Sequence, residues 1–329
     1  MNILYSGFID PNHSSFGGYH NIINYPDASK ILLSENYFLG KLDKRYRLRK
    51  IPLTLLDLDT RIKRHKYDIV HLFYGEITLC PFIPLLKSKK HKTVITLHLD
   101  ILKQKYHNAL LKRLKEFDGI IVLSSQQKEY YLDKFGIKST FIPHGFNTPT
   151  FLKRIPQDIN GQLIDNNKIN LIISGKNYRN FNVLKEVISF FINNNEINFH
   201  LVGSPNEIKK DLYNYKNVRI YGRLSNDEYY TLLQKCDYNF LPVSFATANN
   251  ALLEAQSLGV KSILPRIPGI LDYSSPDNIF YDDDNIIKTI QGLDKSNISN
   301  QILDYSKNFH WDKIYVKLHQ FYSTLISNQ

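Results

Sequence analysis

The stretch that decides the fold is LPVSFATANNALLEAQSLGV, residues 241–260. An apolar run ends at Leu241, an uncharged loop follows, and Asn249 carries the short polar side chain preferred at a helix N-cap. Gly259 suits the position just after a helix C-terminus and precedes another apolar run. This order of strand, helix and strand predicts a βαβ unit of a parallel sheet.

Short apolar runs alternate with stretches of helical spacing along the rest of the chain. The runs are apolar on both faces, which predicts buried strands of parallel sheets. The polar stretch at 148–168 has little periodicity and predicts a linker. Ser204 and Ser225 each lie three residues before a Glu, which predicts two helix N-caps. Strands are expected at 3–5, 69–73, 94–97, 120–123, 140–142, 169–173, 199–202, 218–221, 238–241 and 262–264, and helices at 79–86, 102–117 and 126–135.

These elements predict an α/β protein made of two Rossmann-like, doubly wound domains. The domains are expected at residues 1–150 and 151–309. Open α/β sheets bind ligands outside the carboxyl ends of their strands, so we expect a site at strand ends that face a cleft between the domains.

Composition excludes several classes of protein. The chain has 329 residues, of which 43% are hydrophobic, and this excludes disorder. No apolar run approaches the roughly 18 residues of a membrane span, and no signal pattern opens the chain. Cys80 and Cys236 are 156 positions apart and provide neither a disulfide framework nor a thiolate metal cage. We therefore expect a soluble, cytoplasmic protein.

Positive charge is concentrated in the first half. Residues 1–150 carry 23 Lys and Arg against 13 Asp and Glu, while residues 151–329 carry 19 against 18. The excess gathers at 41–50, 61–66, 87–92 and 103–115. Such a field attracts anionic lipid headgroups or nucleic acid. Separately solvated basic helices and loops would explain each cluster singly but not the asymmetry, so we favour an anionic surface as partner.

The helix that opens after Asn249 is a candidate anion site. The backbone N–H groups of Asn250, Ala251 and Leu252 precede the first intrahelical bonds, and the helix dipole adds positive charge, so they suit a diphosphate. Glu254, one turn further, could accept hydrogen bonds from a ribose diol. The simpler interpretation is an ordinary capped helix with an exposed Glu.

Residues 241–260 resemble the Glu-x7-Glu region of retaining GT-B glycosyltransferases, the large group one family, also numbered family four. Glu254 falls on the second Glu of that motif, which the resemblance assigns to the nucleotide ribose. The first Glu would stand at Ala246 and is absent. Contacts with the donor sugar would then pass to Thr247, Asn249 and Asn250.

Other pieces of the family pattern follow in order. Residues 221–225 (YGRLS) resemble a turn near the nucleobase, which implicates Gly222, and residues 268–270 (PGI) resemble a glycine loop. Residues 309–326 resemble the last helix of the family, so residues 310–329 are expected to pack back on the first domain. Lys176 and Arg179 follow the first strand of the second half, where the family holds the donor diphosphate with cations. Ordinary surface cations would also fit there.

Two positions in the first half match the family as well. Gly18, in the loop after the first strand, corresponds to glycines that let the backbone approach donor phosphate or acceptor, although a plain turn explains it almost as well. His98 ends the strand TVITL and matches a side chain beside the anomeric centre, so the resemblance makes it the candidate catalytic residue. A structural histidine is the alternative.

The sequence predicts no metal and no cofactor. Asp57-Leu58-Asp59 and Asp282-Asp283-Asp284 fit the Asp-x-Asp pattern of metal-dependent glycosyltransferases, but their settings favour solvated turns or helix starts. Glycine-rich dinucleotide and phosphate loops and a His-Glu-x-x-His zinc motif are absent from the sequence.

Together these features favour a hexosyltransferase-type glycosyltransferase (EC 2.4). The donor would be a UDP or GDP sugar, and the acceptor a hydroxyl of a glycan or lipid-linked glycan in cell-surface polysaccharide synthesis. We expect retention of configuration and a peripheral place at an anionic inner membrane face. The alternatives are a sugar-nucleotide epimerase of the same fold, a non-catalytic sugar-nucleotide binder, and a basic protein that binds or glycosylates nucleic acid. Nucleic acid is not favoured, because the sequence carries no reader motif.

Overall fold

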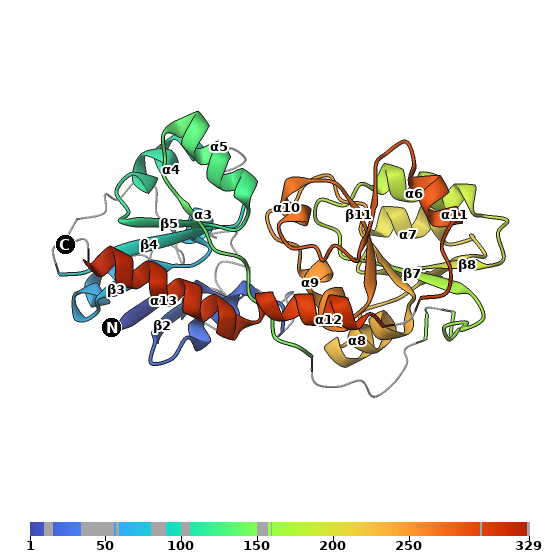
Figure 1. Ribbon diagram of the computed structural model, residues 1–329, viewed down its shortest axis with the longest axis horizontal. Helices are drawn as coiled ribbons and strands as arrows, with labels where there is room; N and C mark the ends of the chain where they lie inside the picture. The colour runs from blue at the N-terminus through green and yellow to red at the C-terminus, as the bar shows by residue number, and fades with distance from the viewer. Residues whose placement is uncertain are drawn as a thin grey trace, which may run out of the picture. The chain divides into compact units, whose positions relative to one another are not determined.

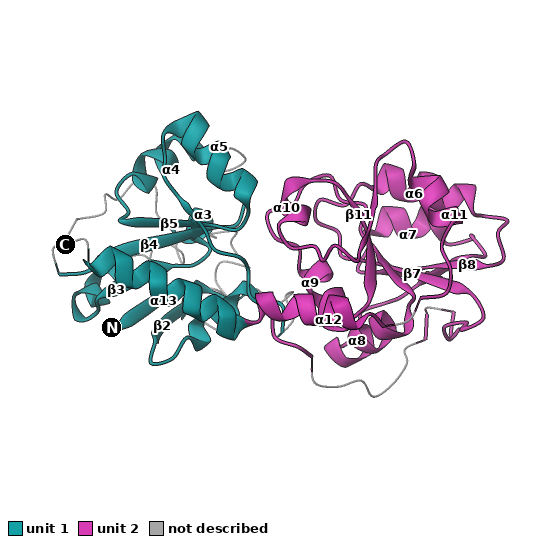
Figure 2. Cartoon of the chain, in the orientation of Figure 1, with its two compact units in different colours: residues 1–145, 311–329 teal, residues 146–310 magenta. Residues whose placement is uncertain are grey.

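The computed structural model (Figure 1) describes residues 1–9, 16–33, 56, 59–79, 90–99, 106–149, 157–158, 160–296 and 298–327. Two compact units share the chain, and Figure 2 colours them separately. Unit 1 consists of residues 1–145 and 311–329, and unit 2 of residues 146–310. The C-terminal segment therefore belongs to the same unit as the N-terminus.

Unit 1 is built on a parallel sheet of six strands in the order β2-β1-β3-β4-β5-β6. Every strand expected in this half is present. The sequence did not indicate β2, because it is an edge strand that begins with Ser29 and Lys30 rather than with an apolar run. The strands are β1 Ile3–Phe8, β2 Ser29–Leu33, β3 Ile69–Leu72, β4 Lys92–Leu97, β5 Gly119–Val122 and β6 Thr140–Phe141.

Helices cover both faces of this sheet (Figure 1). α4 His107–Leu114 and α5 Ser125–Phe135 pack on one face through a core that includes Leu110, Leu114 and Tyr131. α13 Trp311–Ser327 and the 3-10 helix η1 Tyr19–Asn24 lie on the other face. Short helices α3 Gly75–Thr78 and η2 Arg64–Lys66 complete the unit. Of the helix expected at 79–86, all but Leu79 lies outside the described residues, and the one expected at 102–117 is described only from Tyr106 onward.

Unit 2 repeats the architecture with a second six-stranded parallel sheet, ordered β12-β11-β10-β7-β8-β9. Only β12, a short edge strand, was not expected from the sequence. The strands are β7 Ile169–Ser174, β8 Ile197–Val202, β9 Val218–Ile220, β10 Tyr238–Phe240, β11 Lys261–Pro265 and β12 Ile279–Tyr281. Helices α6, α7 and α11 cover one face, and α8, α9 and α12 the other (Figure 1). The helices are α6 Phe181–Phe190, α7 Asn206–Leu212, α8 Asn226–Lys235, α9 Asn250–Ser257, α10 Pro268–Leu271, α11 Ile286–Gln291, α12 Asn300–Ser306 and the 3-10 helix η4 Lys307–Phe309.

The two helix starts predicted from Ser residues have different outcomes. Ser225 forms a full capping box with Glu228, as predicted. The prediction for Ser204 is wrong: Pro205 is the N-cap of α7, and the Ser204 side chain is buried without a hydrogen bond. The reason is local, because extended backbone at Pro205 (ψ 153°) delays the helix by one residue, so that the Glu after it is no longer at the capping-box position.

Candidate functional site

The candidate donor residues lie at the topological switch point of unit 2. From β7 the chain builds outward through β8 and β9, and from β10 it builds in the opposite direction through β11 and β12. Parallel sheets bind ligands at the carboxyl ends of the two strands that flank such a reversal. Those strands are β7 and β10, and the predicted residues Arg179 and Asn249 lie in the loops that follow them.

Backbone hydrogen bonds join these two loops. The Asn180 N–H donates to the Pro242 carbonyl at 2.6 Å, and the Ser244 N–H donates to the Tyr178 carbonyl at 3.0 Å. Between them Arg179 and Val243 form an isolated antiparallel bridge. Segments that are about 65 residues apart in the sequence therefore act as one rigid substructure.

The two predicted cations of the first loop have different settings. Arg179 is partly buried, and its guanidinium donates from Nε to the Ser174 carbonyl at 2.9 Å. Burial lowers the pKa of Arg179 to about 10, although the nearby Tyr229 and Glu254 oppose the shift, so the group stays charged at neutral pH. Lys176 is exposed in the same loop. Arg179 is thus a fixed cation and Lys176 a solvent-facing one.

Glu254 on α9 is buried, with 7% of its surface exposed, and this rules out the simpler interpretation of an exposed Glu. The Tyr229 hydroxyl donates to Oε2 at 3.1 Å and the Tyr230 hydroxyl to Oε1 at 3.2 Å. Burial raises the pKa of Tyr229 well above its usual value, with the Glu254 charge as a further cause, so its hydroxyl stays protonated. The Tyr229 hydroxyl oxygen also lies 3.1 Å from Ser174 Oγ. Sequence reasoning missed both tyrosines, whose only signal was a Tyr pair on a helix.

The start of α9 matches the sequence analysis with one correction. Asn249 is the N-cap, and its Oδ1 accepts from the Leu252 N–H at 3.2 Å. That N–H is consequently used by the cap and does not belong to an anion site. Asn250 and Ala251, the first two residues of the helix, keep the N–H groups that helix geometry leaves without an intrahelical partner. Thr247 and Asn249 are each 8% exposed.

Gly222 and Gly269, from the two turns that resemble the family pattern, lie just after strands of the same sheet. Gly269 is the second residue of α10 and lies so close to the β10–α9 loop that a Cβ there would be 1.8 Å from the Ala246 carbonyl oxygen. Gly222, just after β9, is exposed and has open space around it. Only Gly269 is required by packing.

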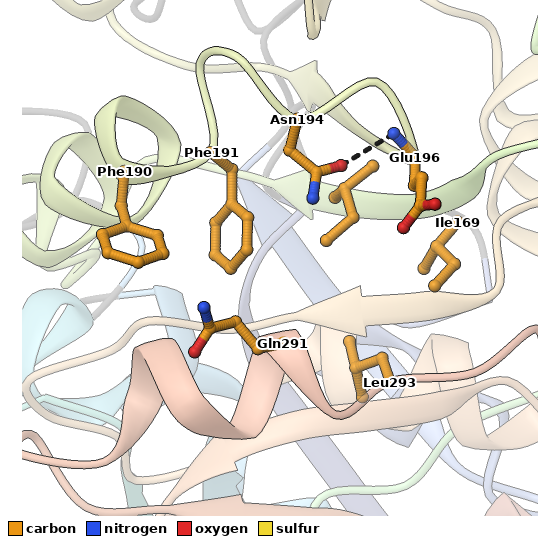
Figure 3. A pocket seen from close by; sticks show the side chains of 8 residues that line it. Ile169, Phe190, Phe191, Asn194, Glu196, Gln291 and Leu293 are labelled. Carbon is orange, nitrogen blue, oxygen red and sulfur yellow. Dashed lines mark hydrogen bonds between the residues drawn. The ribbon is translucent and has the colours of Figure 1, made fainter.

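A separate hollow of about 310 Å³ lies at the opposite end of this sheet (Figure 3). Its lining includes Ile169 and Ile197, the first residues of β7 and β8, and Asn194, whose Oδ1 accepts from the Glu196 N–H at 2.7 Å. None of the predicted site residues lines it.

In unit 1, His98 follows β4 directly and lies among aromatic rings. Its imidazole centroid is 4.3 Å from that of Tyr74 and 4.4 Å from that of Tyr19, and 11% of its side chain is exposed. Tyr19 also places its hydroxyl 3.2 Å from Thr96 Oγ1 on β4. Gly18 is the N-cap of η1, so the structure brings the Gly18–Tyr19 turn and His98 together.

The two Asp-x-Asp segments and the hydropathy of the helices bear on metal binding and on membrane insertion. Asp57 lies outside the described residues, Asp59 pairs with Lys63 at 2.8 Å, and Asp282 to Asp284 are exposed beyond β12. Within the described part of the chain, no cluster of three or more His, Cys, Asp or Glu side chains could hold a metal ion. No helix among the described residues combines the length and hydropathy needed to cross a membrane.

Comparison with known proteins links both units to sugar transfer. Residues 32–149 match the family described as Glycosyltransferase Family 4, and residues 167–293 match Glycosyl transferases group 1. No curated protein matches the chain by sequence.

Solved structures agree at the level of the fold. Starch synthase IV from Arabidopsis thaliana, bound to ADP and acarbose, is similar with a TM-score of 0.74 and 11% identity over 99% of both chains. Sucrose-phosphate synthase from Thermosynechococcus elongatus has a TM-score of 0.67 and 16% identity over 99% of this chain and 89% of that one. HepE of Anabaena, in complex with UDP and glucose, has a TM-score of 0.66 and 13% identity over 98% and 100%.

Proposed function

Because this chain belongs to the group 1 glycosyltransferases of the GT-B fold, hexosyltransferase-type enzymes (EC 2.4), we propose that it transfers a sugar from a nucleotide diphosphate sugar to a hydroxyl group. The donor is of the UDP or GDP type and binds unit 2. The acceptor is a glycan or lipid-linked glycan and binds unit 1. Family membership does not favour the epimerase alternative.

One observation carries the donor assignment: a fixed cation and a buried carboxylate lie together at the switch point of unit 2. Arg179 is held by the Ser174 carbonyl, and Tyr229 connects Ser174 with Glu254. A diphosphate needs positive charge, which Arg179, Lys176 and the α9 N-terminus supply. A ribose diol needs a hydrogen-bond acceptor, and the Glu254 carboxylate is an acceptor whose position the two tyrosine hydroxyls fix.

The proposed chemistry is transfer with retention and without a metal ion. As the bond from the anomeric carbon to the donor phosphate breaks, negative charge grows on the leaving nucleotide. Arg179 would stabilise that charge electrostatically. His98 would position the sugar, and the side chains of Thr247, Asn249 and Asn250 would contact its hydroxyls where Ala246 supplies no carboxylate.

Two variants and one control test the enzyme assignment. Glu254→Ala should abolish transfer by removing the ribose acceptor, and His98→Ala should abolish it while leaving donor binding intact. Glu207→Gln, on an exposed position of α7, is the control and should keep full activity. Donor binding is measured by calorimetry with UDP, GDP and their sugars, and transfer by product analysis with and without acceptor. Full activity in both site variants would contradict the proposal.

We further propose that unit 1 docks on an anionic inner membrane face during polysaccharide synthesis. Lys112, an exposed basic residue of α4, supports this through charge complementarity. The segment 61–66 contributes less than its composition suggests, since Arg64 is buried, and 41–50 lies outside the described residues. Binding to vesicles with anionic lipid should weaken with salt, and vesicles of neutral lipid should not bind. Equal binding to both vesicle types would refute the membrane proposal but not the enzyme assignment.

A further inference from the structure

A buried carboxylate lies behind His98 that neither the sequence nor the family match assigns. Glu76 is the second residue of α3, directly after the turn that ends β3, and its side chain is 0% exposed. A carboxylate in such a place is costly unless hydrogen bonds and charge compensate it. Its contacts therefore indicate why this position is acidic.

One oxygen of Glu76 fixes the turn that carries His98. Oε1 accepts from the His98 backbone N–H at 3.1 Å and from the Leu99 backbone N–H at 3.0 Å. These are the first two N–H groups beyond the end of β4. The carboxylate thus takes the place of a further strand partner and sets where the chain leaves the sheet.

The backbone around Glu76 is itself constrained. Tyr74 adopts a left-handed conformation with φ of 60°, which is unfavourable for a residue with a large side chain. A Cβ on Gly75 would lie 2.0 Å from Ile95 Cγ1 on β4. The turn therefore packs tightly against the neighbouring strand, and Glu76 has little freedom to move away from His98.

The other oxygen of Glu76 faces the imidazole. Oε2 is buried and lies 3.9 Å from His98 Nδ1. The rings of Tyr74 and Tyr19 flank the imidazole and restrict its rotation. A negative charge opposite one ring nitrogen favours the tautomer that carries its proton there.

We propose that Glu76 is the positioning residue of His98. It fixes the turn after β4 through Oε1, and through Oε2 it keeps the imidazole proton on Nδ1. Nε2 then carries the lone pair, and in transfer it would be the ring nitrogen that accepts a hydrogen bond from a sugar or acceptor hydroxyl. Only this last step rests on the proposed function.

Glu76→Gln separates the two roles without changing the size of the side chain. The amide oxygen can still accept from the two backbone N–H groups, which places the amide NH₂ where Oε2 stood. A hydrogen-bond donor then faces Nδ1 in place of an acceptor. We therefore expect the imidazole proton of His98 to move from Nδ1 to Nε2 while the turn is retained.

The test is the ring-nitrogen NMR spectrum of histidine-labelled full-length protein at alkaline pH, where imidazole side chains are neutral. The His98 signals are assigned by their loss in His98→Ala. We expect the Nδ1–H form in the wild type and the Nε2–H form in Glu76→Gln. Glu116→Gln, which removes a surface partner of Arg113, is the matched control and should leave the His98 signals unmoved.

The wild-type spectrum needs no substrate, and its assignment needs only His98→Ala, so it decides the proposal even if Glu76→Gln does not fold or the enzyme assignment fails. An Nε2–H tautomer in the wild type would overturn the proposal, as would an unchanged tautomer in a folded Glu76→Gln protein. Where transfer can be assayed, we expect at least a tenfold fall in kcat for Glu76→Gln with the donor KM unchanged. An unchanged kcat would exclude a contribution of the tautomer to transfer.

Discussion

Gly269→Ala tests whether backbone contact between two loops holds the donor site in place. Gly269 is the second residue of α10, and a Cβ at this position would lie 1.8 Å from the Ala246 carbonyl oxygen and 2.5 Å from its carbon. Both neighbours are backbone atoms, so no side-chain rotation can relieve the clash. Non-bonded heavy atoms pack at roughly 3.5 Å, and the two segments must therefore separate by on the order of 1.5 Å.

The expected cost follows from that separation. Overpacking of a well-packed site costs typically about 1–3 kcal/mol. For a unit of this size, about 2 kcal/mol lowers the melting temperature by roughly 4–8 °C. A displacement of about 1 Å in a positioning element can also reduce activity by roughly two orders of magnitude. Because Ala246 lies in the β10–α9 loop, we expect weaker nucleotide binding as well as lower stability.

The assays are thermal unfolding and calorimetric titration with UDP and GDP. Gly292→Ala is the matched control, because a Cβ there meets its nearest atoms at 3.6 and 3.9 Å, and its φ of −88° suits any residue. We expect the control to unfold and bind like the wild type. If Gly269→Ala matched Gly292→Ala in both assays, the close packing of the two loops would not determine the site.

Three further predictions concern unit 2. Tyr229→Phe removes a hydrogen bond to a buried carboxylate and should lower the free energy of unfolding by about 2 kcal/mol in urea titrations, whereas Tyr213→Phe, at an exposed tyrosine, should not. Ser225→Ala should cost about 1 kcal/mol by the same measurement, but Ser204→Ala should cost nothing, since only the first caps a helix. Burial lowers the pKa of His200 to about 3, whereas a histidine in the unfolded chain has a pKa of about 6.5. Between these two pH values the unfolded state binds more protons than the folded state, so the free energy of unfolding decreases as the pH is lowered. His200 should contribute about 2 kcal/mol to the loss from pH 7 to 5, and His200→Gln should remove that part, whereas the part due to His71, whose pKa burial also lowers to about 3, should remain; an equal slope in that variant would contradict the assignment.

The two units differ in how their buried carboxylates are supported. In unit 2, Glu254 receives hydrogen bonds from two tyrosine hydroxyls. In unit 1, Glu76 receives them from two backbone N–H groups and faces the His98 ring. Both carboxylates are buried, and in both cases the supporting groups come from another segment of the chain. Substituting the supporting groups is therefore as informative as substituting the predicted site residues.

The sequence by itself determined the two α/β units, because apolar β-branched runs and helix caps are local signals. It also determined the Asn249 cap. The motif around Glu254 was sufficient to predict the family of the second unit without the structure. The edge strands β2 and β12 were not predicted, because their apolar runs are only three residues long and such short runs do not distinguish a strand from other structure.

Only the tertiary structure decided which side chains support the candidate site. The capping box of Ser225 could be predicted because its partner lies three residues away. The hydrogen-bond partners of the Tyr229 hydroxyl, in contrast, lie 25 and 55 residues away, and those of Glu76 lie 22 and 23 residues away. Parallel sheets bring the ends of distant strands together, and no local pattern records which residues then meet. Gly269 is needed for the same reason, because its neighbour in space is Ala246, which the chain reaches only through α9 and β11. The use of the Leu252 N–H by the cap is instead a local contact, since Asn249 lies three residues before it.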